Sequence, residues 1–415
     1  MLSVSEALTR VLSNFQPLDS EPIPIHSAVG RVLARPVRAT LNLPPFPNSS
    51  MDGYAVRADD TRLASERVPT ALTVVGDVPA GVKPTLHVRP GVAVRVMTGA
   101  HLPDGADAVV PIEATGVARS VVNGPPPAQI EIRRSVDRGA YVRFVGEDVQ
   151  AGEVVMEPGK EVRAYDVGVL AAFGLTEVQV VRRPRVAVLS TGDELVEVDQ
   201  APGLGQIRDS NSHSLAALVN KYGGEPIVLG VARDRVEAVS EKLRAAVDGK
   251  TDLIVSSAGV SVGAYDVVKA AVEAEGALDF WKVSMRPGKP VAFGNFRGIP
   301  FFGLPGNPVS AIVCFELFVR PVLRVMGGRQ NVSKPTVDAA LTESLQSDGR
   351  ESYLRAVVTK EGDRYIARSA GGQGSNILSA LVNANALVII PEGMTEVPAG
   401  SMVKAWMLDW PEEVF

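Results

Sequence analysis

The sequence of 415 residues carries 42 Lys and Arg against 47 Asp and Glu, a formal net charge of −5, and its length predicts roughly two to four domains. Hydrophobic residues make up 46% and charged residues 21%, which excludes a wholly disordered chain. The slightly acidic balance argues against a protein that coats nucleic acid or an anionic membrane through bulk positive charge. An anionic ligand would have to meet local cations and backbone amides instead.

A single cysteine, Cys314, excludes a disulfide framework within this chain and a zinc site built from several cysteines. The start of the chain, Met1–Arg10, lacks the apolar core of a signal peptide. The most apolar helical candidate, Val309–Val319, is too short to span a bilayer and contains Glu316. We therefore expect a cytoplasmic protein that has no membrane partner.

The first part of the chain is predicted to be mixed in structure. Ser3 and Glu6 have the spacing of a capping box for a helix that reaches about Leu12. Prolines at 22–24 and 44–47 predict extended chain after this helix. A separate all-β module is then expected, followed by a helix that Gly174 ends. The strands of that module are predicted over 71–75, 92–97, 108–112 and 129–132, and the helix over 165–173.

From residue 185 onward, valine-rich strands alternate with helices. Strands are predicted over 186–189, 227–231, 253–255, 280–283 and 299–302, and helices over 212–222, 236–247, 266–275 and 309–326. This alternation is typical of a doubly wound α/β domain. After Pro335 the helical pattern stops, and the remaining runs predict a small β-barrel or sandwich. Those runs are 337–341, 353–358, 365–368, 386–390 and 402–408.

Three loops at the expected carboxyl edge of the parallel strands are rich in small and polar residues: 190–194, 256–263 and 304–308. Doubly wound sheets bind their ligands at this edge. Glycine lets backbone N–H groups approach a phosphate closely, and the helix behind each loop adds favourable partial charge. One such loop is more often a plain turn. Three on the same edge favour a phosphorylated or nucleotide-like ligand.

Near the same edge, Lys282, Arg286 and Lys289 lie in a segment that Pro287 and Pro290 keep from forming a helix. A solvated basic stretch is the ordinary interpretation of such a run of cations. The prolines constrain the backbone, however, and the segment directly follows a predicted strand. We therefore favour an oxyanion-binding segment.

Four carboxylates, those of Asp193, Glu194, Asp234 and Asp266, also fall at strand ends, and none has a paired His or Cys. Oxygen ligands of this kind favour a hard cation, so Mg²⁺ is the expected metal rather than Zn²⁺. The alternative for an acid at a loop–helix junction is a helix cap, which is the role we expect for Asp209-Ser210-Asn211 ahead of the helix predicted from Ser212.

Several other chemistries are disfavoured. The four histidines have neither metal nor triad spacing, and Cys314 lies on an apolar helical stretch, where a buried structural thiol is expected. The sequence contains neither a phosphate-binding loop of the G-x-x-x-x-G-K-[ST] type nor a G-x-G-x-x-G motif between a strand and a helix. Kinase and dehydrogenase activities are therefore weakened as hypotheses.

Together with further motifs, these loops resemble those of the MoeA/gephyrin E-domain family, the molybdopterin molybdotransferases of molybdenum-cofactor synthesis. The resemblance covers nearly the whole chain and consists of seven motifs in order. These are Pro47–Ala55, Val96–Ala100, Gly146–Val149, Ser190–Leu195, Ser261–Gly263 followed by Asp266, Pro287–Pro290, and Leu304–Ser310.

The resemblance implies a homodimer whose subunits have four domains. They would be an N-terminal mixed domain of residues 1–53 and 146–180, an inserted β domain of 54–145, a MogA-like α/β domain of 181–328 that binds molybdopterin, and a C-terminal β-barrel of 329–415. The implied reaction is the Mg²⁺-dependent insertion of molybdate into adenylylated molybdopterin, which releases AMP. Transient contact with a MogA-type adenylyltransferase and the absence of a nucleic-acid partner are also expected.

The resemblance assigns roles residue by residue. Catalytic positions are expected at Asp52, Glu194, Asp234, Asp266, Lys282 and Arg286, and metal ligands at Asp193, Glu194, Asp234 and Asp266. The glycine-rich loops would bind the pterin nucleotide through Thr191, Gly192, Ser261, Gly263, Pro305, Gly306, Asn307 and Pro308. A molybdate pocket is matched by Lys289, Ser310, Arg350 and Ser375. Asp52, Thr98, Arg143 and Asp148 match positions that lie near the partner subunit's cleft in the family.

Departures from the family pattern, among them those at Arg286 and Ala258, and two alternative functions accompany this assignment. Arg286 stands where family members often have Lys, and Ala258 replaces a common Gly. The first alternative is a molybdopterin adenylyltransferase that uses the same α/β cleft, although such enzymes typically need only that domain. The second is a non-catalytic scaffold of the same fold, which the absence of a long linker disfavours.

Overall fold

The computed structural model describes residues 1–117, 124–257 and 265–410. The chain divides into two compact units, one of residues 1–35, 158–167 and 177–415 and the other of residues 36–157 and 168–176. Residues 1–53 and 146–180, which we predict to form one domain, are divided between the two units, and the boundaries of the four domains stay predictions. Within the described ranges, none of the helices is long and apolar enough to cross a membrane.

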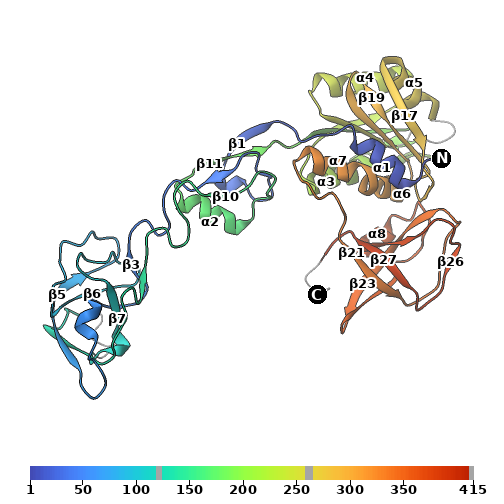
Figure 1. The fold of residues 1–415 in the computed structure, drawn as a ribbon. Helices are drawn as coiled ribbons and strands as arrows, with labels where there is room; N and C mark the ends of the chain where they lie inside the picture. Colours follow the sequence, from blue (N-terminus) through green and yellow to red (C-terminus); the bar gives the residue numbers. More distant parts are fainter. Residues whose placement is uncertain (118–123, 258–264, 411–415) are drawn as a thin grey trace. The chain divides into compact units, whose positions relative to one another are not determined.

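A six-stranded sheet forms the centre of the α/β domain, in the order β15-β12-β16-β20-β19-β17 (Figure 1). Its strands are β12 (Arg185–Thr191), β15 (Glu225–Ala232), β16 (Leu253–Ser257), β17 (Gly276–Lys282), β19 (Pro290–Phe296) and β20 (Ile299–Leu304). The first four strands in the spatial order are parallel, whereas β19 and β17 are antiparallel to their neighbours. The predicted doubly wound α/β class is therefore confirmed.

Helices cover both faces of this sheet (Figure 1). One face packs against α1 (Val4–Leu12), α3 (Asn211–Lys221), α6 (Pro308–Cys314) and α7 (Arg320–Met326), and the other against α4 (Val236–Asp248) and α5 (Tyr265–Glu275). The capping box predicted for the first helix is present, because Ser3 and Glu6 bond reciprocally. Although we predict this helix in the N-terminal domain, its apolar face is buried in the core of the α/β domain.

A π-helical turn, η5 (Phe315–Val319), joins α6 to α7 and carries a buried charge cluster. Glu316 accepts hydrogen bonds from Lys334 Nζ at 2.6 Å and from the Tyr222 hydroxyl at 2.7 Å. Arg320, on the next turn, donates to the Val332 carbonyl at 2.6 Å. These bonds fasten the segment 327–335, which leads into the C-terminal strands, to the helices of the α/β domain.

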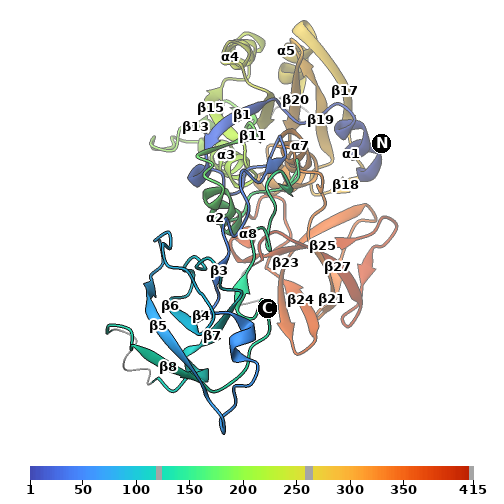
Figure 2. The ribbon, with the colours of Figure 1, turned by 60° about the vertical axis from the view of Figure 1, so that its left-hand side comes forward.

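The C-terminal strands close into a five-stranded barrel, as predicted (Figure 2). They are β21 (Thr336–Leu341), β23 (Glu351–Glu361), β24 (Arg364–Ser369), β25 (Ala386–Ile390) and β27 (Met402–Met407), with the short helix α8 (Ser379–Asn383) and the two-residue strands β22 (Leu345–Gln346) and β26 (Glu396–Val397) beside them. A short strand of the α/β domain, β18 (Met285–Arg286), pairs in parallel with β23. The barrel sheet thus includes a segment of the neighbouring domain.

The other unit contains a five-stranded sheet in the order β7-β4-β6-β5-β8 (Figure 2). Its strands are β4 (Gly53–Val56), β5 (Thr70–Val78), β6 (Val92–Val96), β7 (Ala108–Pro111) and β8 (Gln129–Ile132). Two further strand pairs of this unit are β3 (Asn48–Ser49) with β9 (Val142–Arg143) and β2 (Val37–Arg38) with β10 (Val154–Met156). In the first unit, β1 (Ser20–Pro24) pairs with β11 (Glu177–Val181), and α2 (Ala164–Ala172) begins there.

Replacing Glu316 with Leu is expected to lower the free energy of unfolding by about 3–5 kcal/mol, because Lys334 and Arg320 would stay buried without their counter-charge. Denaturant unfolding of the variant measures this loss. The exposed ion pair of Arg10 with Asp279 supplies the control, since Asp279→Asn should cost less than about 1 kcal/mol. Equal losses in the two variants would contradict a structural role for the cluster.

Candidate active site

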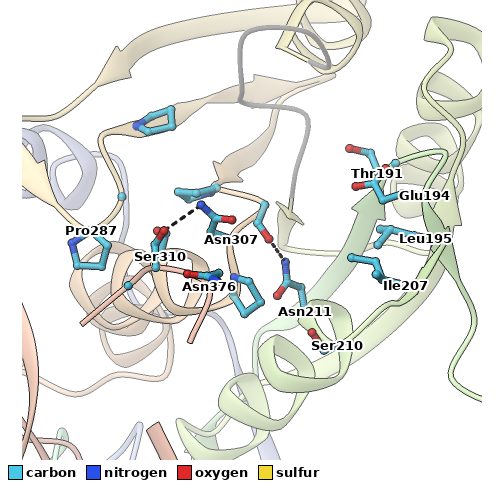
Figure 3. Close-up of a pocket in the computed structure, with 18 of the residues that line it drawn as sticks. Thr191, Glu194, Leu195, Ile207, Ser210, Asn211, Pro287, Asn307, Ser310 and Asn376 are labelled. Carbon is cyan, nitrogen blue, oxygen red and sulfur yellow. Dashed lines mark hydrogen bonds between the residues drawn. The ribbon is translucent and has the colours of Figure 1, made fainter. Parts of the chain in front are cut away.

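A cavity of about 840 Å³ lies at the carboxyl edge of the parallel strands, where the α/β domain meets the barrel (Figure 3). This volume suits a small-molecule or cofactor ligand. Thirteen of the residues selected from the sequence line it: Thr191, Gly192, Glu194, Asp234, Arg286, Lys289, Pro305, Gly306, Asn307, Pro308, Ser310, Arg350 and Ser375. In Figure 3, Thr191 and Glu194 lie at one end and Pro287 at the other, with Asn307 and Ser310 between them.

The acidic end of the cavity is built by the loop that follows β12. Gly192 has a φ of +152°, and a Cβ at this position would lie only 2.6 Å from the Glu194 carboxylate. This φ is one that other residues rarely adopt, so the turn favours glycine, whereas the Glu194 carboxylate stands at the end of a flexible side chain that could move away from a Cβ. Leu195 and Ile207, on the paired short strands β13 (Leu195–Val196) and β14 (Ile207–Arg208), add an apolar wall beside the acids (Figure 3).

Asp234 lies close to two other acids, Asp193 and Glu194, at this end of the cavity. Its burial and the neighbouring charges of Asp193 and Glu194 raise the pKa of the Asp234 carboxyl. Its backbone N–H donates to Asp193 Oδ1 at 3.3 Å, and its own buried Oδ1 has no hydrogen-bond partner. A buried oxygen left unsatisfied among acids is the environment that a bound cation relieves.

Within the described ranges, no three His, Cys, Asp or Glu side chains are close enough together to hold a metal ion as they stand. The unpaired carboxylate oxygen of Asp234 and the neighbouring carboxylate of Glu194 nevertheless match the oxygen ligands that Mg²⁺ uses, because Mg²⁺ takes few protein ligands and keeps several waters. Asp266, the fourth predicted ligand, lies in the first turn of α5, and its side chain lies outside the described residues.

The opposite end of the cavity is cationic. Arg286 reaches it from β18, Lys289 from the loop before β19, and Arg350 from the residue before β23. Arg350 donates to the Met285 carbonyl at 2.9 Å and pairs with Asp348 at 2.5 Å, and this pairing lowers the pKa of Asp348. Its guanidinium is therefore held in one place by the segment that carries Arg286.

Small polar side chains line the centre of the cavity. Ser310 lies in the first turn of α6, which begins with Pro308 at its first position and Asn307 as its cap residue. Asn307 Nδ2 donates to Ser375 Oγ at 3.0 Å, and the Val309 N–H donates to the Ser375 carbonyl at 3.2 Å. The Pro-Gly-Asn-Pro turn thus holds Ser375, from the barrel, beside the N-terminus of α6.

Sequence reasoning missed Arg355, which lies behind the cationic end. Only 1% of this residue is exposed, and its Nη2 donates to the carbonyls of Gly372 and Gly374 at 2.7 and 3.0 Å. Its Nε and Nη1 have no hydrogen-bond partner, and burial together with nearby Arg286 lowers its pKa. The only sequence signal is an arginine inside an otherwise apolar strand, a position where a charge is costly.

Asp209 and Asn211, which the sequence places in a helix cap, also make hydrogen bonds to the ends of neighbouring strands. Asp209 lies one residue before Ser210, the cap residue of α3, and its carboxylate accepts the first N–H groups of the helix, those of Asn211 and Ser212, and also accepts from Ser190 Oγ at 2.9 Å. Asn211 Nδ2 donates both to Ser257 Oγ at 2.6 Å and to the Gly306 carbonyl at 2.8 Å. One side chain therefore joins the ends of β16 and β20.

The remaining predicted residues do not all meet in the cavity. The Lys282 side chain is exposed and Asp193 is exposed, and neither lines the cavity. Ser261 and Gly263 lie outside the described residues. Each of these assignments stays a prediction.

Four predicted residues belong to the other unit: Asp52, Thr98, Arg143 and Asp148. Asp52 Oδ1 accepts hydrogen bonds from the Thr98 N–H at 2.7 Å and from the Thr98 hydroxyl at 2.8 Å. Arg143 is exposed on β9, opposite Asn48. The motifs 47–55 and 96–100 therefore meet in one local structure.

Comparison with known proteins defines the class first. Residues 2–174 match the MoeA N-terminal region (domain I and II), residues 187–325 a probable molybdopterin binding domain, and residues 338–408 the MoeA C-terminal region (domain IV). Two crystal structures of the molybdopterin biosynthesis MoeA protein from Pyrococcus horikoshii have TM-scores of 0.84 and 0.81 to this structure, at 33% and 34% identity. They cover 99% and 98% of this chain and the whole of those chains.

Curated relatives then identify the family. The chain is 42% identical to molybdopterin molybdenumtransferase 2 of Mycobacterium tuberculosis over 98% of this chain and 100% of that protein. It is 39% identical to the molybdopterin molybdenumtransferase of a Nostoc species over 93% of this chain and 88% of that protein. The chain therefore belongs to the molybdopterin molybdenumtransferase family, a family of transferases, and the predicted resemblance is confirmed.

Gly288, which precedes Lys289 in the cationic wall, is expected not to tolerate alanine. Its φ is +107°, and a Cβ there would lie 2.3 Å from the sulfur of buried Cys314, so Gly288→Ala combines backbone strain with overpacking. We expect a loss of about 2–4 kcal/mol in thermal or denaturant unfolding.

Gly298→Ala is the matched control, because Gly298 has a φ of +83° and open space around its Cβ position. It should show the backbone cost alone. Adding Cys314→Ala to Gly288→Ala should bring the loss close to that of Gly298→Ala. A double variant as unstable as Gly288→Ala would refute the predicted collision.

Proposed function

We propose that this protein transfers molybdenum from molybdate to adenylylated molybdopterin and releases AMP. The observation that carries the proposal is the two-ended cavity, in which an acid-lined, glycine-rich loop faces a cluster of three cations across a row of small polar side chains. A nucleotide-bearing substrate suits the first end, and a tetrahedral oxyanion suits the second. The names of the relatives, which are molybdopterin molybdenumtransferases, support the same reaction.

In this proposal the chain acts by positioning its two substrates and stabilising their charge. Arg286, Lys289 and Arg350 hold molybdate, while the loop around Gly192 holds the phosphoanhydride. A molybdate oxygen forms a bond to the adenylyl phosphorus, and the bond from that phosphorus to the molybdopterin phosphate oxygen breaks. The two dithiolene sulfurs replace two oxygens on molybdenum. One of the two displaced oxygens leaves on the phosphate of AMP, and the other takes up the two thiol protons and leaves as water.

Mg²⁺ is part of the proposal. Asp234 and Glu194, with Asp193 or Asp266 as further candidates, would hold the ion, which when bound supplies positive charge at the phosphoanhydride. The unpaired buried oxygen of Asp234 and the raised pKa of its carboxyl support this assignment. Because protons compete for the same carboxylate, Mg²⁺ binding should strengthen as the pH rises.

We further propose a cytoplasmic homodimer that has transient contact with a MogA-type adenylyltransferase. The exposed apolar residues Met51, Phe144 and Val145 adjoin the predicted partner-facing positions in sequence, which supports a self-association surface. Sedimentation of the purified protein at the mass of one chain would refute the dimer. The presence of the barrel residues Arg350 and Ser375 in the cavity favours the transfer reaction over the adenylyltransferase alternative, which needs the α/β domain alone.

The decisive test is AMP release from adenylylated molybdopterin. We expect release that depends on molybdate. Lys289→Ala should raise the molybdate concentration for half-maximal rate by about tenfold or more, because it removes one charge-assisted hydrogen bond. Lys360→Ala, an exposed lysine of the barrel, is the control. Formation of the adenylate from ATP and molybdopterin would instead favour the adenylyltransferase, and molybdate-independent AMP release would contradict the proposal.

Asp234→Asn should weaken Mg²⁺ binding by about tenfold or more and lower AMP release at a fixed Mg²⁺ concentration, because it removes a ligand charge. Titration calorimetry with Mg²⁺ measures the first effect and the AMP assay the second. Asp199→Asn, an exposed acid of the loop after β13, is the matched control. Unchanged Mg²⁺ affinity in Asp234→Asn would remove this residue from the metal site.

A further inference from the structure

Two asparagines connect the two ends of the cavity through the turn that follows β20. Asn211, at the start of α3, donates one amide hydrogen to Ser257 Oγ at 2.6 Å and the other to the Gly306 carbonyl at 2.8 Å. Asn307, the next residue of the turn, donates to Ser375 Oγ at 3.0 Å. We call this series of linked residues, Asn211, Gly306, Asn307 and Ser375, the asparagine bridge.

The orientation of the Asn211 amide is fixed by chemistry. The Gly306 carbonyl can only accept a hydrogen bond, so the nitrogen of the amide must face it. Turning the amide over would place two oxygens against each other and would lose both donations. The Asn211 backbone is fixed as well, because its N–H donates to Asp209, which also accepts from Ser190 at the end of β12. Asn211 therefore holds the turn at Gly306 in a fixed position relative to the loops that follow β12 and β16.

The other half of the bridge runs into the barrel. Pro305 and Pro308 limit the backbone freedom of the turn on either side of Gly306 and Asn307. Ser375 receives the Asn307 side chain at its hydroxyl and the Val309 N–H at its carbonyl. The loop of Ser375 is held from behind by Arg355, through the Gly374 carbonyl. A shift of the turn would therefore move Ser375 relative to the acidic end of the cavity.

From this connectivity we infer that Asn211 and Asn307 are positioning residues. They hold the oxyanion end of the cavity at a fixed distance and orientation from the nucleotide end. The inference rests on the proposed function, since the relative position of the two ends matters only if two substrates react across the cavity. A misplacement of about 1 Å between reacting groups can cost about a hundredfold in rate without a comparable loss of binding. The asparagine bridge should thus affect the transfer step more than the affinity for either substrate.

The test is a comparison of Asn211→Ala and Asn307→Ala with wild type in the AMP-release assay, with product binding followed in parallel. At saturating adenylylated molybdopterin and molybdate, we expect kcat to fall about a hundredfold in Asn211→Ala, while KM for each substrate stays within about threefold. AMP binding, measured by calorimetry, should stay within about twofold of wild type, which shows that the nucleotide end is folded. Asn220→Ala, an exposed asparagine at the other end of α3, should behave as wild type.

A double variant tests whether the two asparagines act as one unit. If both work through the same turn, Asn211→Ala with Asn307→Ala should lose about as much kcat as the more damaged single variant. Multiplied losses would show two separate roles and overturn the bridge.

The remaining outcomes separate the inference from the function on which it rests. An active wild type with unchanged kcat in Asn211→Ala, or with a change confined to KM, overturns the inference alone. Loss of AMP binding in Asn211→Ala would show a general structural role and would also overturn it. A wild type that releases no AMP overturns the proposed function and the inference together.

Discussion

The candidate site depends on one short backbone pairing, that of β18 with β23. Met285 lies opposite Glu351 and Arg286 opposite Ser352 in a parallel register, and Arg350 adds a hydrogen bond to the Met285 carbonyl. This pairing makes a segment of the α/β domain part of the barrel sheet. Because the backbone sets the register, the cations that the two domains contribute come together without any attraction between them.

That arrangement has an electrostatic cost, which the cavity is organised to offset. Burial lowers the pKa of Arg355, and the nearby charge of Arg286 lowers it further, while Asp348 neutralises part of the cluster through Arg350. The Nε and Nη1 nitrogens of Arg355 are buried and have no hydrogen-bond partner. Uncompensated positive charge of this kind favours an anion at the site. A chain with a net charge of −5 can therefore attract an oxyanion at one place through local charge alone.

The sequence predicted those parts of the site that follow from local pattern. The loops around Thr191 and Gly306 were placed correctly at one edge, since the carboxyl ends of parallel strands meet there whatever their order. Strand β19 was not predicted, because Pro290 and Gly294 break its pattern. Arg355 was missed because burial inside a strand depends on the barrel around it. Asn211 looked like part of a cap, and only the folded chain shows which carbonyl its amide reaches.

The distinction between residues that carry charge and residues that set distance explains why the second kind is hard to read from a sequence. Lys289 and Arg286 carry positive charge, which the sequence shows directly, so cations beside prolines already indicate an oxyanion-binding segment. Asn211 and Asn307 are neutral, and their role lies in two backbone or hydroxyl partners from distant segments. A reaction between two bound substrates needs both kinds of residue. Charge determines which ligands enter the cavity, and the hydrogen-bonded turn between the ends determines how far apart they lie.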